Sequence, residues 1–374
     1  MNRVLFVTPL PPPVHGAAMV SQQIQRSRLI NEAFDCDFIN SSISKNVDDI
    51  NRFKIVKIFR HLGIWFRLFS KLISERYDLC YLAITCHGKS FLKDVPFVLL
   101  CKLFGRKIII HQHNKGMSKD IDVRPYRWLL PLCYRNAKVI LLSWHLYEDI
   151  SHVVPKENVI ICPNGIAIPE NRSAIQKEGN RAVRLLFLSN LIESKGVIVL
   201  LDALKILMER GRSFRCDFAG GETKEISAGR FAQEVDIRGL NGFAFYNGCL
   251  YGEDKGRIFD NSDIFVLPTF YENECFPLVL LEAMAHRLPI VTTDEGGIPD
   301  MVENGKNGLI CRKDNSVSLA ECIARLLDDE AMRLEMGDAG YNLYQSNFTE
   351  QHFEHRMVEC LDSALSPSKQ DSRY

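Results

Sequence analysis

The chain has 374 residues with 46 basic and 46 acidic side chains, so its formal net charge is zero. Its apolar content of 46% and charged content of 25% are typical of a water-soluble globular protein with two or three domains. No apolar run reaches the roughly 18 residues that predict a membrane-spanning helix. The 12 cysteines lack C-x-x-C pairs and histidine partners at zinc spacing, which favours reduced thiols in the cytoplasm over disulfides or a metal site.

Apolar segments rich in β-formers alternate with segments that suit helices along both halves of the chain. In the first half, strands are predicted at 3–8, 37–40, 79–84, 107–111, 139–143 and 159–162. In the second half, they are predicted at 184–189, 215–219, 243–246, 264–267, 289–292 and 308–311. This alternation predicts an α/β protein with two doubly wound, Rossmann-like domains, which we expect to face each other across a cleft.

Composition also predicts the domain boundaries. The N-terminal domain takes residues 1–168, and residues 169–181 form a polar linker without periodicity. The C-terminal domain takes residues 182–347. We expect residues 348–365 to form a helix that packs back toward the N-terminal domain, and residues 366–374 to be a flexible tail.

Two loops of the first half follow predicted strands and carry candidate functional residues. Gly16 lies where a helix begins after the first strand, and it either lets a phosphate approach the backbone or only serves a turn. The full G-x-G-x-x-G fingerprint is missing, which argues against a dinucleotide dehydrogenase. His111 and His113 follow the fourth strand. His113 is suited to hydrogen-bond a sugar or a reacting hydroxyl near neutral pH, and the alternative for either histidine is a bond to backbone.

Residues 52–74 predict a basic amphipathic helix with aromatic side chains and no acid. Such a helix either lies on an anionic membrane or packs its apolar side into the domain core. Residues 1–168 carry a net charge of +10 and the remainder −10, which favours an anionic surface, while no recognised motif indicates nucleic acid. The basic residues are Arg52, Lys54, Lys57, Arg60, Arg67 and Lys71, and the apolar positions are Ile55, Ile58 with Phe59, Leu62, Trp65 with Phe66, Phe69, and Leu72 with Ile73.

In the second half, the loop after the first strand carries Asn190 and Lys195. A lysine placed before a helix can pair with a diphosphate as a point charge, and an exposed structural lysine is the alternative. Gly220 with Gly221, and Gly296 with Gly297, permit close backbone approach or simply mark turns.

The segment 274–285 is the most informative, because Glu274 and Glu282 stand eight positions apart after the buried strand 264–267. Pro277 suits the first position of the helix that follows. The free N–H groups of that helix's first turn form an anion site between two acids, and carboxylates accept hydrogen bonds from sugar hydroxyls. A nucleotide sugar fits this arrangement, whereas either glutamate alone is more often a solvated acid.

Together these segments resemble the retaining glycosyltransferases of the family 4 type, the glycosyl transferases group 1, which have the GT-B fold. The resemblance spans nearly the whole chain and implies a bacterial surface-polysaccharide enzyme. The order of the segments is more specific than any one of them. They are Pro163-Asn164-Gly165-Ile166, Lys195-Gly196, Gly220-Gly221, Phe245 to Gly248, Ser262 to Pro268, Glu274 to Glu282, Gly296 to Pro299 and Asn307-Gly308-Leu309.

The resemblance implies roles for individual residues. Glu274 accepts from donor-sugar hydroxyls, Glu282 binds the ribose diol and Lys195 holds the diphosphate. Gly16 lets the first loop close on the phosphates, and His113 matches the family histidine near the anomeric carbon. Relatives often have arginine where this chain has Asn190, so the phosphate charge must be offset differently here. The remaining donor-binding positions are Gly221, Phe276, Pro277, Leu278 and Val279.

The implied reaction moves a sugar from a nucleoside diphosphate to a hydroxyl of a glycan or lipid-linked acceptor, with O-antigen, capsule or lipopolysaccharide as the expected product. No carboxylate is placed as a covalent nucleophile, and no Asp-x-Asp pair predicts a metal, so neither metal nor cofactor is expected. We expect a cytoplasmic protein bound peripherally to the inner face of the membrane. The sequence leaves the sugar, the base, the acceptor, the linkage and the oligomeric state open.

Two other classes remain. A sugar-nucleotide epimerase of the same shape would need no acceptor, so release of nucleoside diphosphate only with acceptor present would exclude it. A non-catalytic nucleotide-sugar-binding protein would bind donor without turnover on any acceptor.

Overall fold

The computed structural model describes residues 1–12, 16–42, 55–167 and 181–366, without the side chains of 55–58. The chain divides into two units. The first comprises Met1–Asn164 and Glu350–Tyr374, and the second is Gly165–Thr349. The first unit ends before the predicted residue 168, because the Ile166 N–H donates to Phe348 O over 2.9 Å and ties this segment to the second unit. Residues 169–180 of the predicted linker 169–181, and residues 367–374 of the predicted tail 366–374, fall outside the described residues.

The first unit is built on a six-stranded parallel sheet in the order β2-β1-β3-β4-β5-β6. All six predicted strands are present, although β2 begins two residues earlier than expected. Central strands such as β1 and β4 are buried along almost their whole length, which is why they read as continuous apolar runs. The strands are β1 (Arg3–Thr8), β2 (Asp35–Asn40), β3 (Leu79–Ala83), β4 (Lys107–His111), β5 (Lys138–Leu141) and β6 (Val159–Ile161).

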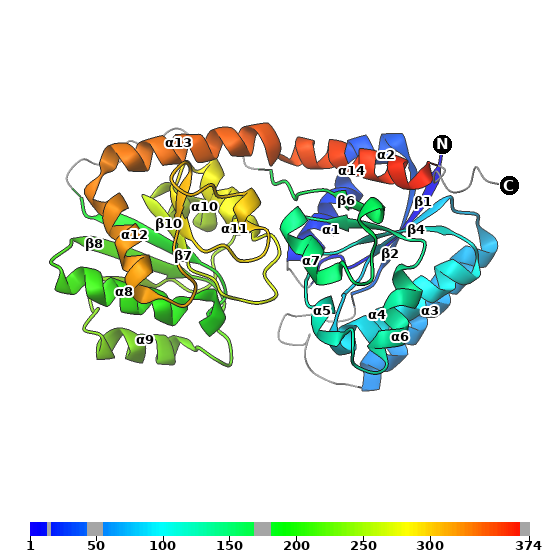
Figure 1. Ribbon diagram of the computed structural model, residues 1–374, viewed down its shortest axis with the longest axis horizontal. Coiled ribbons are helices and arrows are strands. Elements are labelled where there is room, and N and C mark those ends of the chain that lie inside the picture. Colours follow the sequence, from blue (N-terminus) through cyan, green and yellow to red (C-terminus); the bar gives the residue numbers. More distant parts are fainter. Residues whose placement is uncertain (13–15, 43–54, 168–180, 367–374) are drawn as a thin grey trace. The chain divides into compact units, whose positions relative to one another are not determined.

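Helices cover both faces of this sheet (Figure 1), with α2 and α14 on one side and α3, α4 and α6 on the other. The helix α14 (Glu350–Leu365) comes from the end of the chain and packs on α2, β3 and β4. It buries Phe353, Met357 and Leu361 completely. The other helices are α1 (Gly16–Arg26), α2 (Arg28–Ala33), α3 (Ile55–Ser74), α4 (Gly88–Leu103), α5 (Met117–Asp120), α6 (Tyr126–Tyr134) and α7 (Tyr147–Ile150).

The second unit repeats the architecture with the strand order β12-β11-β10-β7-β8-β9, again all parallel. The six predicted strands are found here too. They are β7 (Val183–Leu188), β8 (Phe214–Ala219), β9 (Ala244–Tyr246), β10 (Ile264–Leu267), β11 (Ile290–Thr292) and β12 (Gly308–Ile310). The predicted α/β class with two doubly wound sheets is therefore confirmed.

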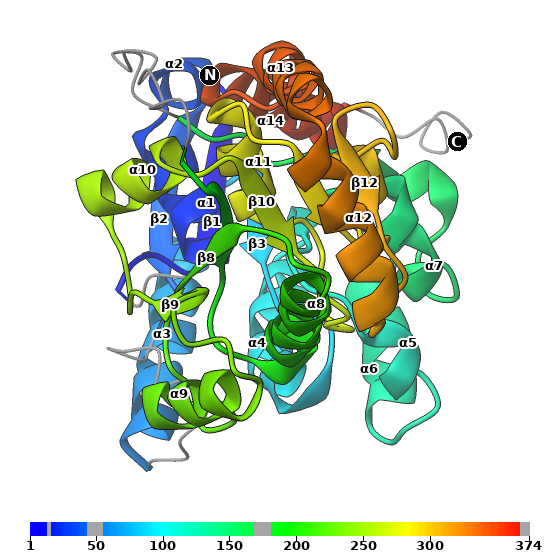
Figure 2. The same cartoon turned by 90° about the vertical axis from the view of Figure 1, so that its left-hand side faces the viewer.

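In the described residues of the second unit, the helices α8 to α13 flank the sheet; α8 packs along α12 (Figure 2) and α11 packs on α13. They are α8 (Val197–Glu209), α9 (Ala228–Ile237), α10 (Gly252–Asp260), α11 (Leu278–Ala285), α12 (Ser316–Asp328) and α13 (Glu330–Asn347). The direction of strand succession reverses between the neighbours β7 and β10. In an open α/β sheet, ligands bind outside the carboxyl ends of the strands at such a point. In the part of the chain that the structure describes, no helix combines the length and the apolar character needed to cross a bilayer.

Candidate functional site

The residues predicted to bind a donor gather in the second unit at the carboxyl ends of β7 and β10. Lys195 lies in the loop after β7, and Glu274 lies in the loop after β10. The two loops are joined by a hydrogen bond from Phe270 N–H to Ser194 O over 2.8 Å. The point where the strand order reverses therefore carries both predicted charges.

Lys195 and Glu274 form a direct ion pair between Lys195 Nζ and Glu274 Oε2. Their side chains are only 15% and 9% exposed. The hydroxyl of Thr269 also donates to Glu274 Oε2 over 3.4 Å, and Lys195 Nζ lies 4.8 Å from the centre of the Tyr271 ring. Because polar groups removed from water need partners, each of these side chains satisfies the other and fixes its orientation.

Two glycines allow the loops around this pair to come together. Gly196 has φ +87°, and a Cβ there would lie 2.4 Å from Pro268 O, at the end of β10. Gly296 has φ +57°, and a Cβ there would lie 2.1 Å from Glu274 O. Gly297 N–H donates to Cys275 O over 2.7 Å. The close backbone approach expected at Gly296 and Gly297 therefore involves another loop of the protein, and it fixes the backbone that carries Glu274.

The helix α11 begins at Leu278, four residues after Glu274. Pro277 is its N-cap, with φ −68° and ψ 108°, and not its first helical residue as predicted, because its ψ is extended. No group in the described part of the chain accepts from the N–H of Phe276, Leu278 or Val279. The ring of Phe276 packs against that of Phe348, with ring centres 5.9 Å apart. These are the N–H groups that the sequence predicts to form an anion site.

Glu282 lies on the second turn of α11 and pairs with Lys255 of α10 over 2.6 Å. The two side chains are 25% and 29% exposed, so the pair is reachable from solvent. Sequence reasoning missed Lys255 because it sits 27 positions away on a helix without a motif. Thr269 was missed for a similar reason, since a threonine after a strand is a common residue.

Asn190 and the glycines after β8 form the other border of the site. Asn190 Oδ1 accepts from Gly221 N–H over 3.2 Å, and Leu191 N–H donates to Gly221 O over 2.8 Å. A Cβ at Gly220 would lie 1.9 Å from Ser189 O, so this position admits no side chain. Asn190 thus ties two loops together, and it supplies no positive charge in place of the arginine found in relatives.

Gly16 and His113 belong to the first unit. Gly16 is the first residue of α1, and a Cβ there would meet no described atom within 4 Å. His113 is half-buried, with its ring 4.0 Å from that of His111. His111 is fully buried and shares a hydrogen bond of 2.6 Å with the Tyr81 hydroxyl. Burial, assisted by the neighbouring His113, lowers the pKa of His111 well below its usual value, so this ring stays neutral.

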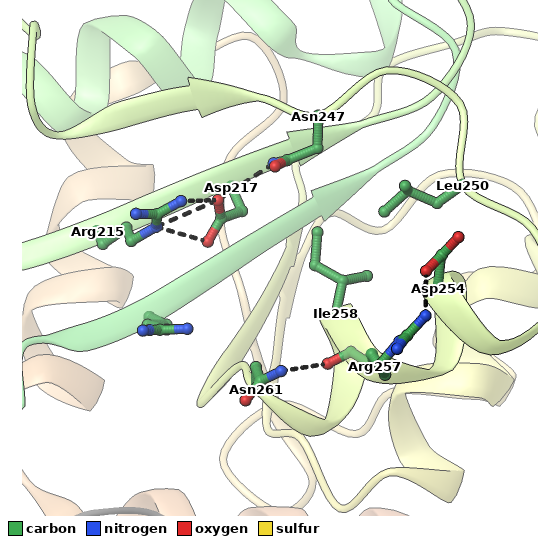
Figure 3. Close-up of a pocket in the computed structure, with 9 residues that line it drawn as sticks. Arg215, Asp217, Asn247, Leu250, Asp254, Arg257, Ile258 and Asn261 are labelled. Carbon is green, nitrogen blue, oxygen red and sulfur yellow. Dashed lines mark hydrogen bonds and ion pairs between the residues drawn. The ribbon is translucent and has the colours of Figure 1, made fainter.

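A cavity of about 320 Å³ in the second unit lies apart from these residues (Figure 3). None of the predicted donor-binding residues lines it. Arg215 pairs with Asp217 over 2.8 Å, and Arg257 pairs with Asp254, so its opposite charges largely satisfy one another. We therefore place the candidate site at Lys195 and Glu274. The cavity is lined by Arg184, Arg215, Asp217, Asn247, Leu250, Asp254, Arg257, Ile258 and Asn261.

Comparison with known proteins shows what the chain is similar to. Residues 168–343 match the family model of glycosyl transferases group 1. The amylovoran biosynthesis glycosyltransferase AmsK of Erwinia amylovora is 26% identical over 267 residues, which are 70% of this chain and 64% of that protein. The capsular polysaccharide biosynthesis glycosyltransferase CapM of Staphylococcus aureus is 28% identical over 183 residues, which are 49% and 47% of the two chains. The alignments thus span from about half to just under two thirds of these relatives.

Among solved structures, Anabaena HepE in complex with UDP-glucose superposes with a TM-score of 0.72 at 17% identity, covering 97% of this chain and 100% of that one. This likeness shows the fold, which is GT-B. The chain is thus related to group 1 glycosyltransferases and has relatives in polysaccharide biosynthesis.

Proposed function

We propose that the protein is a retaining glycosyltransferase that moves a sugar from a nucleoside-diphosphate sugar to a hydroxyl of a glycan or lipid-linked acceptor in bacterial surface-polysaccharide synthesis. The observation that carries this proposal is the Lys195–Glu274 pair where the strand order reverses between β7 and β10. The relatives in amylovoran and capsule synthesis support it, as does the UDP-glucose held by HepE.

In this proposal, the donor lies along the loops after β7 and β10. Lys195 and the N–H groups of Phe276, Leu278 and Val279 attract the diphosphate and stabilise the charge that develops on it as the glycosidic bond breaks. Glu274 accepts from hydroxyls of the sugar. Lys195 holds the Glu274 carboxylate in place, and Glu282 takes the ribose diol. These are the interactions that a nucleotide sugar needs at its two ends.

The first unit would complete the reaction. Gly16 would leave room for the donor phosphates, and the neutral His111 would support His113 beside the reacting centre. Neither Glu274 nor Glu282 acts as base or nucleophile, so the acceptor hydroxyl attacks on the face of the leaving diphosphate, which takes its proton. Neither a metal nor a cofactor takes part in the proposed reaction. The basic first unit favours action on a lipid-linked acceptor at the cytoplasmic face of the membrane.

The first experiment is a thermal-shift screen of the protein against nucleotide sugars, because a ligand that binds the folded state raises its Tm. The donor found in this way is then tested with Glu274→Gln, which removes the charge and keeps the shape of the side chain. We expect transfer, measured as kcat/KM, to fall by about 100-fold or more, which is the usual cost of one lost transition-state contact. Glu274→Ala should do the same and also destabilise the fold, because Lys195 is left unpaired.

Glu272→Gln is the matched control, since Glu272 is an exposed acid of the same loop. It should keep wild-type turnover. Full turnover by Glu274→Gln with donor and acceptor would refute the assignment of the site. Nucleoside diphosphate released without acceptor, or donor bound without any transfer, would instead favour the epimerase or the binding protein.

A further inference from the structure

The helix α3 has two apolar faces, whereas the sequence pattern predicts one. Leu68 and Leu72 are fully buried against the first unit. A second set of large apolar side chains points to solvent at positions separated alternately by three and four residues, so it forms one continuous line along the helix. This set, the α3 ridge, consists of Phe59, Leu62, Phe66, Phe69 and Ile73, which are 68%, 47%, 71%, 38% and 61% exposed.

Little of the described chain covers this ridge. Phe69, its least exposed member, packs edge-on against Phe104 with ring centres 5.8 Å apart. Leu103, next in sequence to Phe104, is itself 75% exposed and extends the apolar surface toward the end of α4. The ridge runs for about 21 Å along the helix, given the rise of 1.5 Å per residue. Exposed apolar surface of this extent commonly marks a contact with a partner or a membrane.

The charged side chains described on α3 are all basic. Arg60 and Arg67 are exposed and lie about 100° around the helix from Phe59 and Phe66. Helix α3 contains no acidic residue, and residues 52–107 hold 12 basic against three acidic side chains. The side chains of Arg52, Lys54 and Lys57 fall outside the described part of the chain, so the surface is defined from Phe59 onward.

We propose that the α3 ridge docks the protein on an anionic lipid bilayer. The helix would lie flat in the interface, with the phenylalanines among the acyl chains and Arg60 and Arg67 at the headgroups. This proposal adds a membrane-binding surface to the proposed function, and it rests on that function only for the identity of the acceptor. A second copy of the chain fits less well, because apposed α3 helices would bring like charges together.

The test is flotation of the purified protein with vesicles of phosphatidylcholine, with or without phosphatidylglycerol. The ridge variant is Phe59→Gln/Phe66→Gln/Ile73→Gln, which spares Phe69 because of its contact with Phe104. The charge variant is Arg60→Glu/Arg67→Glu. The matched controls come from the second unit. Ile237→Gln/Leu334→Gln removes two equally exposed apolar side chains, and Lys224→Glu/Arg312→Glu reverses two exposed charges.

We expect the wild type and both controls to float with phosphatidylglycerol vesicles. The ridge variant should bind at least tenfold less. The charge variant should bind more than about 25-fold less, since each lost basic side chain costs about a fivefold factor and the two new glutamates add repulsion. Both variants should keep the wild-type Tm and the donor-induced rise in Tm. A failed donor screen would therefore count against the proposed reaction, whereas unchanged flotation of the ridge variant would count against this surface alone.

Two further outcomes would overturn the proposal. A lower Tm of the ridge variant would mean that the ridge is covered by the chain itself. A wild-type dimer that the ridge variant converts to a monomer, measured by light scattering, would mean that a second copy occupies it.

Discussion

Lys255 shows how a side chain outside any motif can determine the geometry of a predicted one. Its ammonium holds Glu282 from the neighbouring helix α10 over 2.6 Å. The side chains of Lys255 and Glu282 are 29% and 25% exposed, so the pair contributes at most about 1 kcal/mol to stability. Its larger effect is on orientation, because a carboxylate that binds two adjacent hydroxyls must be held in one rotamer.

We therefore predict that Lys255→Met weakens donor binding by about fivefold and leaves Tm within a degree or two of the wild type. Lys255→Arg should restore most of the affinity, because the guanidinium also reaches a carboxylate. Titration calorimetry with the donor measures both. If Lys255→Met binds donor as tightly as the wild type, the orientation of Glu282 does not depend on this pair.

Asp94 in α4 makes the stability of the fold depend on pH, and substitution of this one residue isolates its contribution. Its carboxylate accepts from Thr85 N–H over 2.9 Å, and burial raises its pKa from 3.8 to about 6. The folded state therefore holds this proton more tightly than the unfolded state does. The contribution of Asp94 to stability is highest below pH 4 and is lost as the pH rises through 6.

Relative to Asp94→Asn, the wild type should lose about 2 kcal/mol of unfolding free energy between pH 4 and pH 7. This is less than the full pKa difference gives, because the residue keeps some contact with water. Urea unfolding of both proteins at the two pH values measures it. His111 acts in the opposite direction in this range, but it is present in both proteins and cancels. A difference that stays constant with pH would show that Asp94 is ionised throughout.

Among the elements, the loops after β7, β10 and β11 act as one body because their backbones touch. Gly296 is the tightest point, since an added Cβ would lie 2.1 Å from Glu274 O in a left-handed conformation. We predict that Gly296→Ala destabilises the second unit by about 3 kcal/mol and abolishes donor binding. Gly16→Ala is the contrasting substitution, because no described atom lies near its Cβ, and it should change stability by less than about 0.5 kcal/mol.

Thermal unfolding and the donor-induced Tm shift distinguish the two glycine variants. If Gly16 leaves room for the donor phosphates, Gly16→Ala weakens donor binding although the fold is unaffected. If Gly296→Ala is as stable as the wild type, the loop that carries Glu274 can move independently of the loop that carries Gly296.

The strands and helices could be predicted from the sequence, whereas the contacts between them could not. A parallel strand such as β10 is buried on both faces, so it leaves an apolar run that alternation with helices makes recognisable. Lys195 and Glu274 could be assigned to one site because each follows such a strand. Their ion pair depends on β7 and β10 being neighbours, which only the tertiary fold decides. For α3, helical periodicity cannot separate a core face from an exposed face when both are apolar.

At the scale of the whole chain, the two units differ in whether one continuous segment of the sequence forms them. The second is continuous, Gly165–Thr349, whereas the first needs α14 from beyond it. Phe353, Met357 and Leu361 of α14 are fully buried in the first unit, so residues 1–164 alone would expose a large apolar surface on α2, β3 and β4. We predict that residues 165–349 fold when expressed alone and retain the donor-induced Tm shift, while residues 1–164 do not fold.

In the full chain, Phe353→Ala tests the same dependence of the first unit on α14. Truncating a buried phenylalanine leaves a cavity and costs about 3–5 kcal/mol. Because this loss falls on the first unit, calorimetry should show one transition moved down by many degrees and the transition of the second unit unchanged. Leu334→Ala on the exposed side of α13 is the control and should move neither. If both transitions fall together with Phe353→Ala, the units unfold as one cooperative body, and the stability of the donor site then depends on the end of the chain as well.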